Sequence, residues 1–393
     1  HLMLARIEGA PAGTKGISLF VVPRLRPDDA DRLVSNDITV TQVYHKLGYR
    51  GAPITELAIG EKDDCRGYLV GEPHKGLKYM FQMMNEARIG VGIGATGIAS
   101  AAYYAALDYA GDRTQGRKLT SKDPAKPQIP IIEHADVKRM LLFQRAVVEG
   151  SLSLLLQCSL YSDYLYAEDE EQKESAGLML EILTPVAKTY PAEMGILSIS
   201  QSIQCFGGYG YCEDFPVAQY YRDARIHPIH EGTTGIQGMD LLGRKVIMAD
   251  GKAFRLYLEN IRETIKSASE VSEAHKAYAD QLEAALQNLE TVTLGLIGLA
   301  QSKGPEAYLA DATLYLEFFG IITVAWQWLK QGIVAEERHQ KAKSRREKNF
   351  YQGKLYTFKY FFEYELPKIE GLAKRLSRAD NLTLEMAADF FID

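Results

Sequence analysis

The first candidate for acid–base chemistry is Glu231, which lies in the run His-Pro-Ile-His-Glu-Gly-Thr-Thr-Gly over residues 227–235. The carboxylate directly precedes Gly232 and lies between two apolar segments, so it falls on a turn that can hold it out of water against a ligand. Desolvation raises the pKa of a carboxylate towards that of a useful general base. The alternative is a surface glutamate at the start of the next helix, where the helix dipole favours a negative charge.

A second candidate site is Gln-Cys-Phe-Gly-Gly-Tyr-Gly-Tyr over 204–211, where a helix ends in three glycines. Glycine backbone can approach a phosphate or a ring closely, but the same glycines could simply cap the helix. Arg113, between Gly111 and Gly116, could hold a phosphate with its guanidinium or belong to a structural ion pair. Arg88, in a long apolar stretch, fits a buried or interfacial ion pair better than a ligand contact.

Other chemistry has little support in the sequence. The eight histidines form no metal-binding spacing, and no serine or cysteine lies in the pattern of a nucleophile turn. The four cysteines match neither a zinc site nor a disulfide framework, which fits a reducing cytoplasm. We therefore expect no metal site and a bacterial cytoplasmic location.

Composition is that of a globular protein without a strong affinity for polyanions. The chain has 393 residues, 46% of them hydrophobic, and a formal net charge of -6, which argues against a nucleic-acid or anionic-membrane binder. The basic run Lys-Ala-Lys-Ser-Arg-Arg-Glu-Lys over 341–348 is interpreted as a solvated helix face. Residues 89–107 carry no charge, but they are rich in glycine, alanine and serine and predict a buried helix, not a membrane span.

The elements that must position these residues are mostly helices. In about the first seventy residues, apolar and polar residues alternate between turn signals, which is typical of β-strands. From Gly76 the apolar residues recur with the period of a helix. Long helices with short connections predict a bundle. We expect a mainly α fold with three parts: a partial β domain over 1–75, a helical bundle over 76–250, and an additional helical domain over 253–393.

Four motifs in this order make the sequence similar to a known family. Asn-Glu-Ala-Arg-Ile-Gly over 85–90, Asp-Arg-Thr-Gln-Gly-Arg over 112–117, the glycine-rich run over 204–211, and residues 222–237 together resemble the FAD-dependent acyl-CoA dehydrogenases. The resemblance covers residues 1 to about 247. The insertion over 119–130 and the extra helical region resemble the branch that contains 3-methylmercaptopropionyl-CoA dehydrogenase.

The resemblance implies a role for each matching residue. Glu231 matches the base that removes the α proton of an acyl-CoA thioester while FAD takes hydride from the β carbon, which gives a 2-enoyl-CoA. The implied cofactor contacts are Arg113 at the FAD pyrophosphate, Gln204, Gly207 and Gly208 at the adenine half across a subunit interface, and Thr233 and Gln237 at the flavin. The implied substrate contacts are Arg88, His230 and Gly232. The implied partners are an electron-transfer flavoprotein and further copies of the chain, as a homodimer or homotetramer.

The sequence departs from the family pattern at several positions. His230 stands where many members have tyrosine, Gln115 replaces a frequent phenylalanine, and Arg244 lies one residue later than a substrate-contacting arginine would. The family also has a helical domain and the first part of a β barrel ahead of the residue numbered 1, so we expect the chain as given to bind FAD poorly or to be inactive.

Two other functions fit parts of the sequence. One is an alkylation-response flavoprotein of the same fold that binds DNA through residues 341–348, although the net negative charge argues against it. The other is a non-catalytic fragment that serves oligomerisation or acyl-CoA binding.

Overall fold

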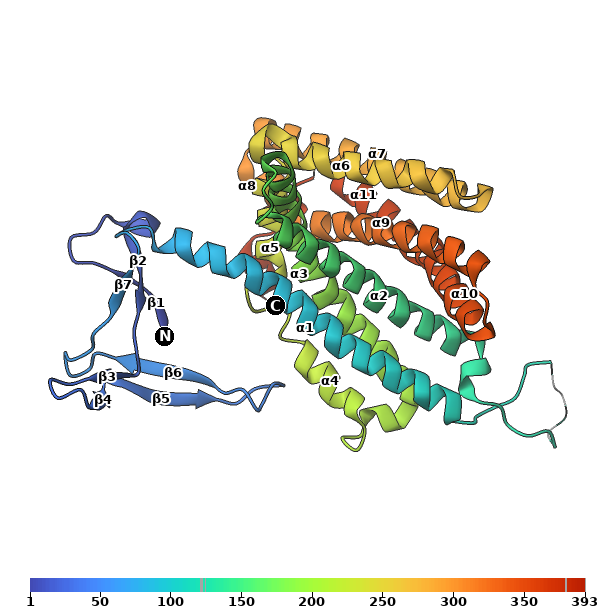
Figure 1. Ribbon diagram of the computed structural model, residues 1–393, viewed down its shortest axis with the longest axis horizontal. Helices are drawn as coiled ribbons and strands as arrows, with labels where there is room; N and C mark the ends of the chain where they lie inside the picture. Colours follow the sequence, from blue (N-terminus) through green and yellow to red (C-terminus); the bar gives the residue numbers. More distant parts are fainter. Residues whose placement is uncertain (121–122, 124, 379, 393) are drawn as a thin grey trace. The chain divides into compact units, whose positions relative to one another are not determined.

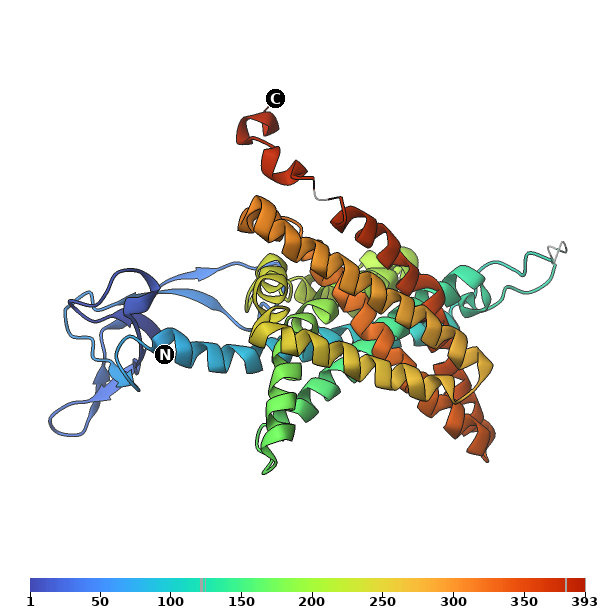
Figure 2. The same ribbon diagram turned by 90° about the horizontal axis from the view of Figure 1, so that it is seen from above.

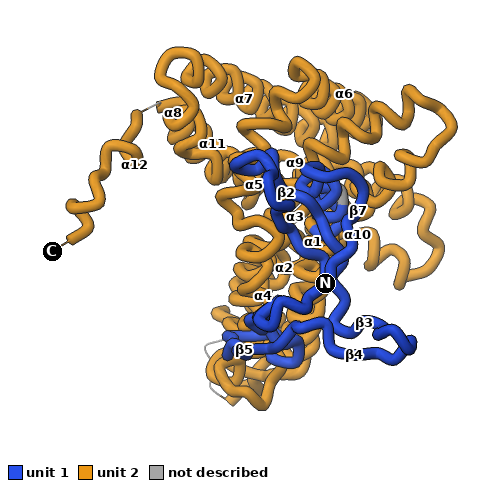
Figure 3. The backbone as a smooth tube through the Cα atoms, turned by 90° about the vertical axis from the view of Figure 1, so that its left-hand side faces the viewer, with its two compact units in different colours: residues 1–87 blue, residues 88–393 orange. Residues whose placement is uncertain are grey.

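The computed structural model of the chain (Figures 1 and 2) describes residues 1–120, 123, 125–378 and 380–392. It divides into two compact units, residues 1–87 and residues 88–393 (Figure 3). The insertion over 119–130 lies partly outside the described residues. Helix α1 (Gly76–Asp112) begins in the first unit and continues into the second.

The first unit is built from short antiparallel strands, as the alternating sequence predicts. Strands β1 (Leu2–Arg6), β2 (Ile17–Val21) and β7 (Tyr68–Val70) form a sheet in the order β1-β2-β7. Strands β3 (Leu25–Pro27) and β4 (Leu33–Ser35) form one pair, and β5 (Ile38–Tyr44) and β6 (Ile54–Ile59) form another. Leu19 and Val22 are buried in this unit.

The second unit is a bundle of long helices with short connections (Figure 1). After α1 come α2 (Ala135–Tyr164), α3 (Glu170–Phe206), α4 (Pro216–Ala224) and α5 (Thr234–Asp240), which a π-helical turn extends over Leu241–Lys245. The later helices are α6 (Met248–Ser269), α7 (Glu273–Lys303), α8 (Pro305–Leu309), α9 (Ala312–Lys341), α10 (Arg345–Tyr360), α11 (Ile369–Leu376) and α12 (Leu382–Glu385). Short 3-10 or π turns cover Gly13–Gly16, Ile131–Glu133, Gly207–Tyr211, Phe361–Glu365, Leu366–Lys368 and Ala388–Phe391.

Capping residues set where two of the helices begin. Asp169 accepts a hydrogen bond from the backbone N–H of Gln172, so α3 starts inside the acidic run over 168–174. Ser344 and Glu347 form a capping box that starts α10. The basic run over 341–348 spans the end of α9, the connection and the start of α10, and it is exposed except for the half-buried Ala342, as expected of a solvated helix face.

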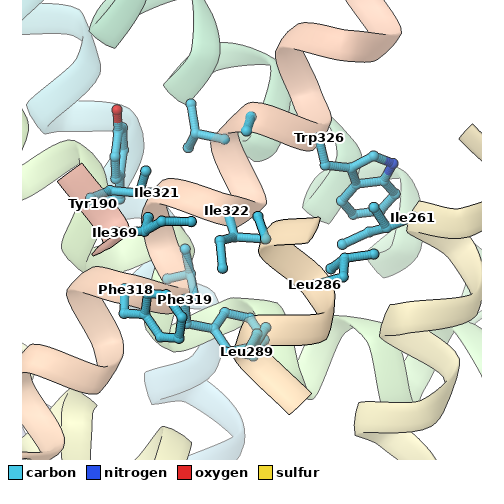
Figure 4. Close-up of a cluster of buried hydrophobic side chains, with 14 of the residues drawn as sticks. Tyr190, Ile261, Leu286, Leu289, Phe318, Phe319, Ile321, Ile322, Trp326 and Ile369 are labelled. Atoms are coloured by element: carbon cyan, nitrogen blue, oxygen red, sulfur yellow. The ribbon is translucent and has the colours of Figure 1, made fainter. Parts of the chain in front are cut away.

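Helix α9 is the centre of the hydrophobic core. It contacts α2, α3, α5, α6, α7, α10 and α11. Figure 4 shows Ile322 and Trp326 of α9 facing Ile261 of α6 and Leu286 of α7. The indole N–H of Trp328 donates to the Ala146 carbonyl of α2 at 2.9 Å. The helices after residue 252 thus share one core with α2 and α3.

Two described helices, α1 and α9, are long and apolar enough by composition to cross a membrane. In the apolar stretch of α9, 83% of the residues are buried inside the protein, which is typical of a core helix. In that of α1, 44% are buried. On α1, Ala99, Ala102 and Ala106 are buried, whereas Ile93 and Tyr104 are exposed. The buried helix expected over 89–107 is therefore buried on one face.

Candidate functional site

Glu231 lies on a tight turn between α4 and α5 in a left-handed conformation. Its φ is +54° and that of Gly232 is +90°. Two left-handed residues in succession turn the chain sharply, and for glutamate this conformation is strained. The Glu231 side chain is exposed. Among the described residues, nothing accepts a hydrogen bond from the Glu231 backbone N–H. The N-cap of α5 is Thr233, so the exposed Glu231 lies two residues before the cap and is not itself the cap.

Two buried side chains hold this turn from the protein side. The Gln237 amide Nε2 donates to the Glu231 carbonyl at 3.1 Å, and the Lys188 ammonium donates to the Gly232 carbonyl at 2.8 Å. Both side chains belong to residues with 0% exposure. A Cβ at Gly232 would lie 2.6 Å from Gln237 Nε2 and would displace that amide, and the φ of +90° favours glycine there. The arrangement fixes the two carbonyls towards buried donors, whereas the Glu231 side chain is exposed.

Two histidines, His227 and His230, precede Glu231 on the same connection. The rings of His227 and His230 meet edge to face with centroids 5.6 Å apart. Burial lowers the pKa of His227, and burial together with the charge of Lys188 lowers the pKa of His230. Both imidazoles are therefore expected to be neutral near pH 7. His230, predicted to contact substrate, lies half-buried beside Glu231.

Arg88 is part of a buried ion pair below the site. Its Nη1 lies 3.0 Å from Asp240 Oδ2, and both side chains are at most 6% exposed. The exposed Arg244 approaches the other carboxylate oxygen at 3.3 Å. The structure thus gives Arg88 the ion-pair contact that the sequence also allowed, and it joins α1 to α5.

Arg113 and the glycine-rich segment come together around one cavity of about 480 Å³. Tyr109, Arg113 and Gln115 line one side, and Phe206 to Tyr209 with Cys212 line another. Gly207 has a φ of +61° and caps α3, so the capping role is real. A Cβ added at Gly207 or Gly208 would meet no atom within 4 Å, which leaves open space beside the backbone.

The cavity has the character of an anion site. Among the described residues, no carboxylate forms an ion pair with Arg113, which removes support for the structural-salt-bridge alternative. An unpaired guanidinium beside two glycines can bind a phosphate in bidentate fashion. Gln204 is exposed on the last turn of α3, next to this cavity.

The predicted site residues therefore form two groups. Glu231, Gly232, Thr233 and Gln237 lie on the turn and α5, and none of them lines the cavity at Arg113. Sequence reasoning placed both groups around one flavin site but did not identify Lys188. A lysine in the otherwise apolar run Thr-Pro-Val-Ala-Lys-Thr-Tyr-Pro over 184–191 was the available signal.

Comparison with known proteins agrees with the motifs. The family description "Acyl-CoA dehydrogenase, C-terminal domain" matches residues 74–247, and "Acetyl-CoA dehydrogenase C-terminal like" matches residues 257–387. The chain is 37% identical to 3-methylmercaptopropionyl-CoA dehydrogenase of Ruegeria pomeroyi over 96% of its own length and 63% of that relative. It thus spans less than two thirds of the length of that curated relative.

Solved structures share the fold. The crystal structure of ACDH-11 from Caenorhabditis elegans in complex with C11-CoA superposes with a TM-score of 0.73 at 21% identity, covering 98% of this chain and 61% of that one. An acyl-CoA dehydrogenase from Bacillus anthracis complexed with FAD gives a TM-score of 0.68 at 19% identity, covering 99% and 61%.

Proposed function

Because the chain belongs to the acyl-CoA dehydrogenase family, we propose that it forms part of an FAD-dependent enzyme that oxidises an acyl-CoA thioester to the 2-enoyl-CoA. Glu231 is the base. The observation that carries this assignment is the turn, in which two buried donors hold the carbonyls and the Glu231 side chain is exposed.

The chemistry needs an oriented base and a donor for the developing enolate. Glu231 takes the α proton, and its backbone N–H, which lacks a partner among the described residues, donates to the thioester oxygen. Arg88, His230 and Gly232 border the region where the acyl thioester binds. Bound FAD supplies the hydride acceptor for the β carbon.

The residues present fit FAD as two half-sites. The Arg113 guanidinium with the open backbone at Gly207 and Gly208 suits a pyrophosphate, and the exposed Gln204 lies beside it. Thr233 and Gln237 are the contacts proposed for the flavin end. Because no residue of the second group lines the cavity at Arg113, we infer that two copies of the chain complete each FAD site, in a homodimer or homotetramer.

Other features of the whole protein are part of the same proposal. An electron-transfer flavoprotein is the electron acceptor, as in the family, and the free cysteines are compatible with a cytoplasmic location. The two family descriptions match on either side of residue 252, and the proposed division there is one of sequence modules, since the helices on both sides share one core. The acyl group is proposed to be a short chain or a thioether chain, after the relative from Ruegeria pomeroyi.

The test is Glu231→Gln in the full-length protein, with Glu259→Gln on an exposed face of α6 as the matched control. We expect anaerobic flavin reduction by butyryl-CoA or 3-methylmercaptopropionyl-CoA to slow by at least about 10²-fold in the first variant, because a general base contributes about 10²–10⁴-fold. In the control variant, the flavin should be reduced at the wild-type rate. Unchanged kinetics of flavin reduction in Glu231→Gln would contradict the assignment of Glu231 as the base.

A further inference from the structure

Lys188 is an unusual feature of α3, because its side chain is completely buried. Its exposure is 0%, and no described carboxylate forms an ion pair with it. Lysine is almost never fully buried without a charged partner. Its ammonium donates to a neutral oxygen, the Gly232 carbonyl, at 2.8 Å. Burying the ammonium costs desolvation free energy, and a single hydrogen bond to a neutral oxygen offsets only part of it. Core packing alone therefore does not explain a lysine at this position.

The charges around Lys188 come from three elements. Arg88 of α1 repels its charge, whereas Glu193 of α3 and Glu231 of the turn attract it. The imidazoles of His227 and His230 face it from the same turn. Burial dominates and lowers the pKa of Lys188 to about 8. Near pH 7 the side chain is therefore still charged, close to the Glu231 carboxylate.

We propose that Lys188 is a positioning residue for Glu231: its ammonium holds the Gly232 carbonyl, and with the Gln237 amide on the Glu231 carbonyl it fixes the left-handed turn that aims the base. This assignment rests on the proposed function of Glu231. A glutamate keeps a left-handed backbone conformation only where surrounding contacts hold it there. Lys188 and Gln237 supply that restraint on two consecutive carbonyls.

The matched control is Lys330 on α9. Burial lowers the pKa of Lys330 as it does that of Lys188, and the Lys330 ammonium likewise donates to a neutral oxygen, Oε1 of Gln157, at 2.5 Å. It does not contact the Glu231 turn. Lys330 is half-buried and its ammonium also lies 5.1 Å from the centre of the Trp326 ring, so Lys330→Met removes the same chemical group at a site away from the turn.

The experiment compares these variants in the full-length protein. We expect Lys188→Met to slow anaerobic flavin reduction by butyryl-CoA about 10- to 100-fold, since misplacement by about 1 Å can cost about 10²-fold. The acid limb of the pH–rate profile should move to higher pH, because loss of a nearby positive charge raises the pKa of a carboxylate. Lys330→Met should keep the wild-type rate and acid limb.

A second measurement does not depend on bound FAD. Hydrogen exchange of the peptide that contains residues 227–235, followed by mass spectrometry, should be at least about tenfold faster in Lys188→Met than in Lys330→Met. If Lys188→Met does not fold, Lys188→Gln replaces it: the neutral amide can still donate, so the acid limb should move while the rate falls less.

Two outcomes would overturn the inference. One is wild-type reduction kinetics and an unmoved acid limb in Lys188→Met or its substitute, with Glu231→Gln inactive in the same assay. The other is equal hydrogen exchange in the Lys188 and Lys330 variants. Activity in Glu231→Gln would instead contradict the proposed function, so the two failures are distinguishable.

Discussion

The packing of α5 on α9 gives a prediction whose sign can be worked out from the structure. Gly238 of α5 lies so close to α9 that an added Cβ would be 2.6 Å from the Ala312 carbonyl oxygen and 2.9 Å from the Thr313 nitrogen. All of these neighbours are backbone atoms, which cannot rotate away. Gly238→Ala therefore forces the two helices apart.

Two effects oppose each other in this substitution. Alanine is favoured over glycine inside a helix by about 1 kcal/mol. Overpacking a close helix contact costs about 1–3 kcal/mol, and here the contact is with rigid backbone, so the upper part of that range applies. We expect the free energy of unfolding to fall by roughly 1–2 kcal/mol net in Gly238→Ala.

Gly298 on α7 provides the control, because an added Cβ there meets nothing within 4 Å. Gly298→Ala should raise the free energy of unfolding by up to about 1 kcal/mol, the helix preference alone. Urea denaturation followed by far-UV circular dichroism gives both values, provided that the m-values match that of the wild type. A Gly238→Ala protein as stable as the wild type would refute the close packing of α5 on α9.

Three further predictions follow from burial and charge. Arg88→Met should lower the free energy of unfolding by about 3–5 kcal/mol, because it leaves Asp240 buried without its main partner; a loss below 1 kcal/mol in urea denaturation would contradict this. The pKa of Lys188 is about 8 in the folded chain against 10.5 ordinarily, so the unfolded chain binds more protons between these values. The free energy of unfolding of the wild type, compared with that of Lys188→Met, should therefore rise between pH 8 and 10.5. If the free energy of unfolding depends on pH equally in both proteins, the pKa of Lys188 is not lowered. A thiol reagent should modify the exposed Cys212 in the native protein and Cys158 only after unfolding, because burial raises the pKa of Cys158 to about 12; peptide mass spectrometry identifies the sites.

Much of the architecture was readable from local patterns. The change from alternating to helical period near Gly76, the glycine-rich end of α3 and the turn at Glu231 all depend on neighbours within a few residues. Boundaries were less predictable where a cap decided them. Asp169 starts α3 inside the acidic run over 168–174, and Ser344 divides the basic run over 341–348 between two helices.

The candidate site was only partly predictable, because its restraints come from distant positions. Glu231, Arg113 and the glycines at 207 and 208 could be chosen from residue type and motif order. The resemblance implied that the glycine segment meets FAD across a subunit interface. Which side chains share a cavity could not be predicted, since a motif records only order along the chain.

The sequence by itself determined the helical bundle with its β segment, the family, and the residue types that bear chemistry. Only the tertiary structure decided that Lys188 reaches the Gly232 carbonyl and that Arg88 pairs with Asp240, across separations of 44 and 152 residues. The physical reason is that burial of a charge depends on which helices pack around it.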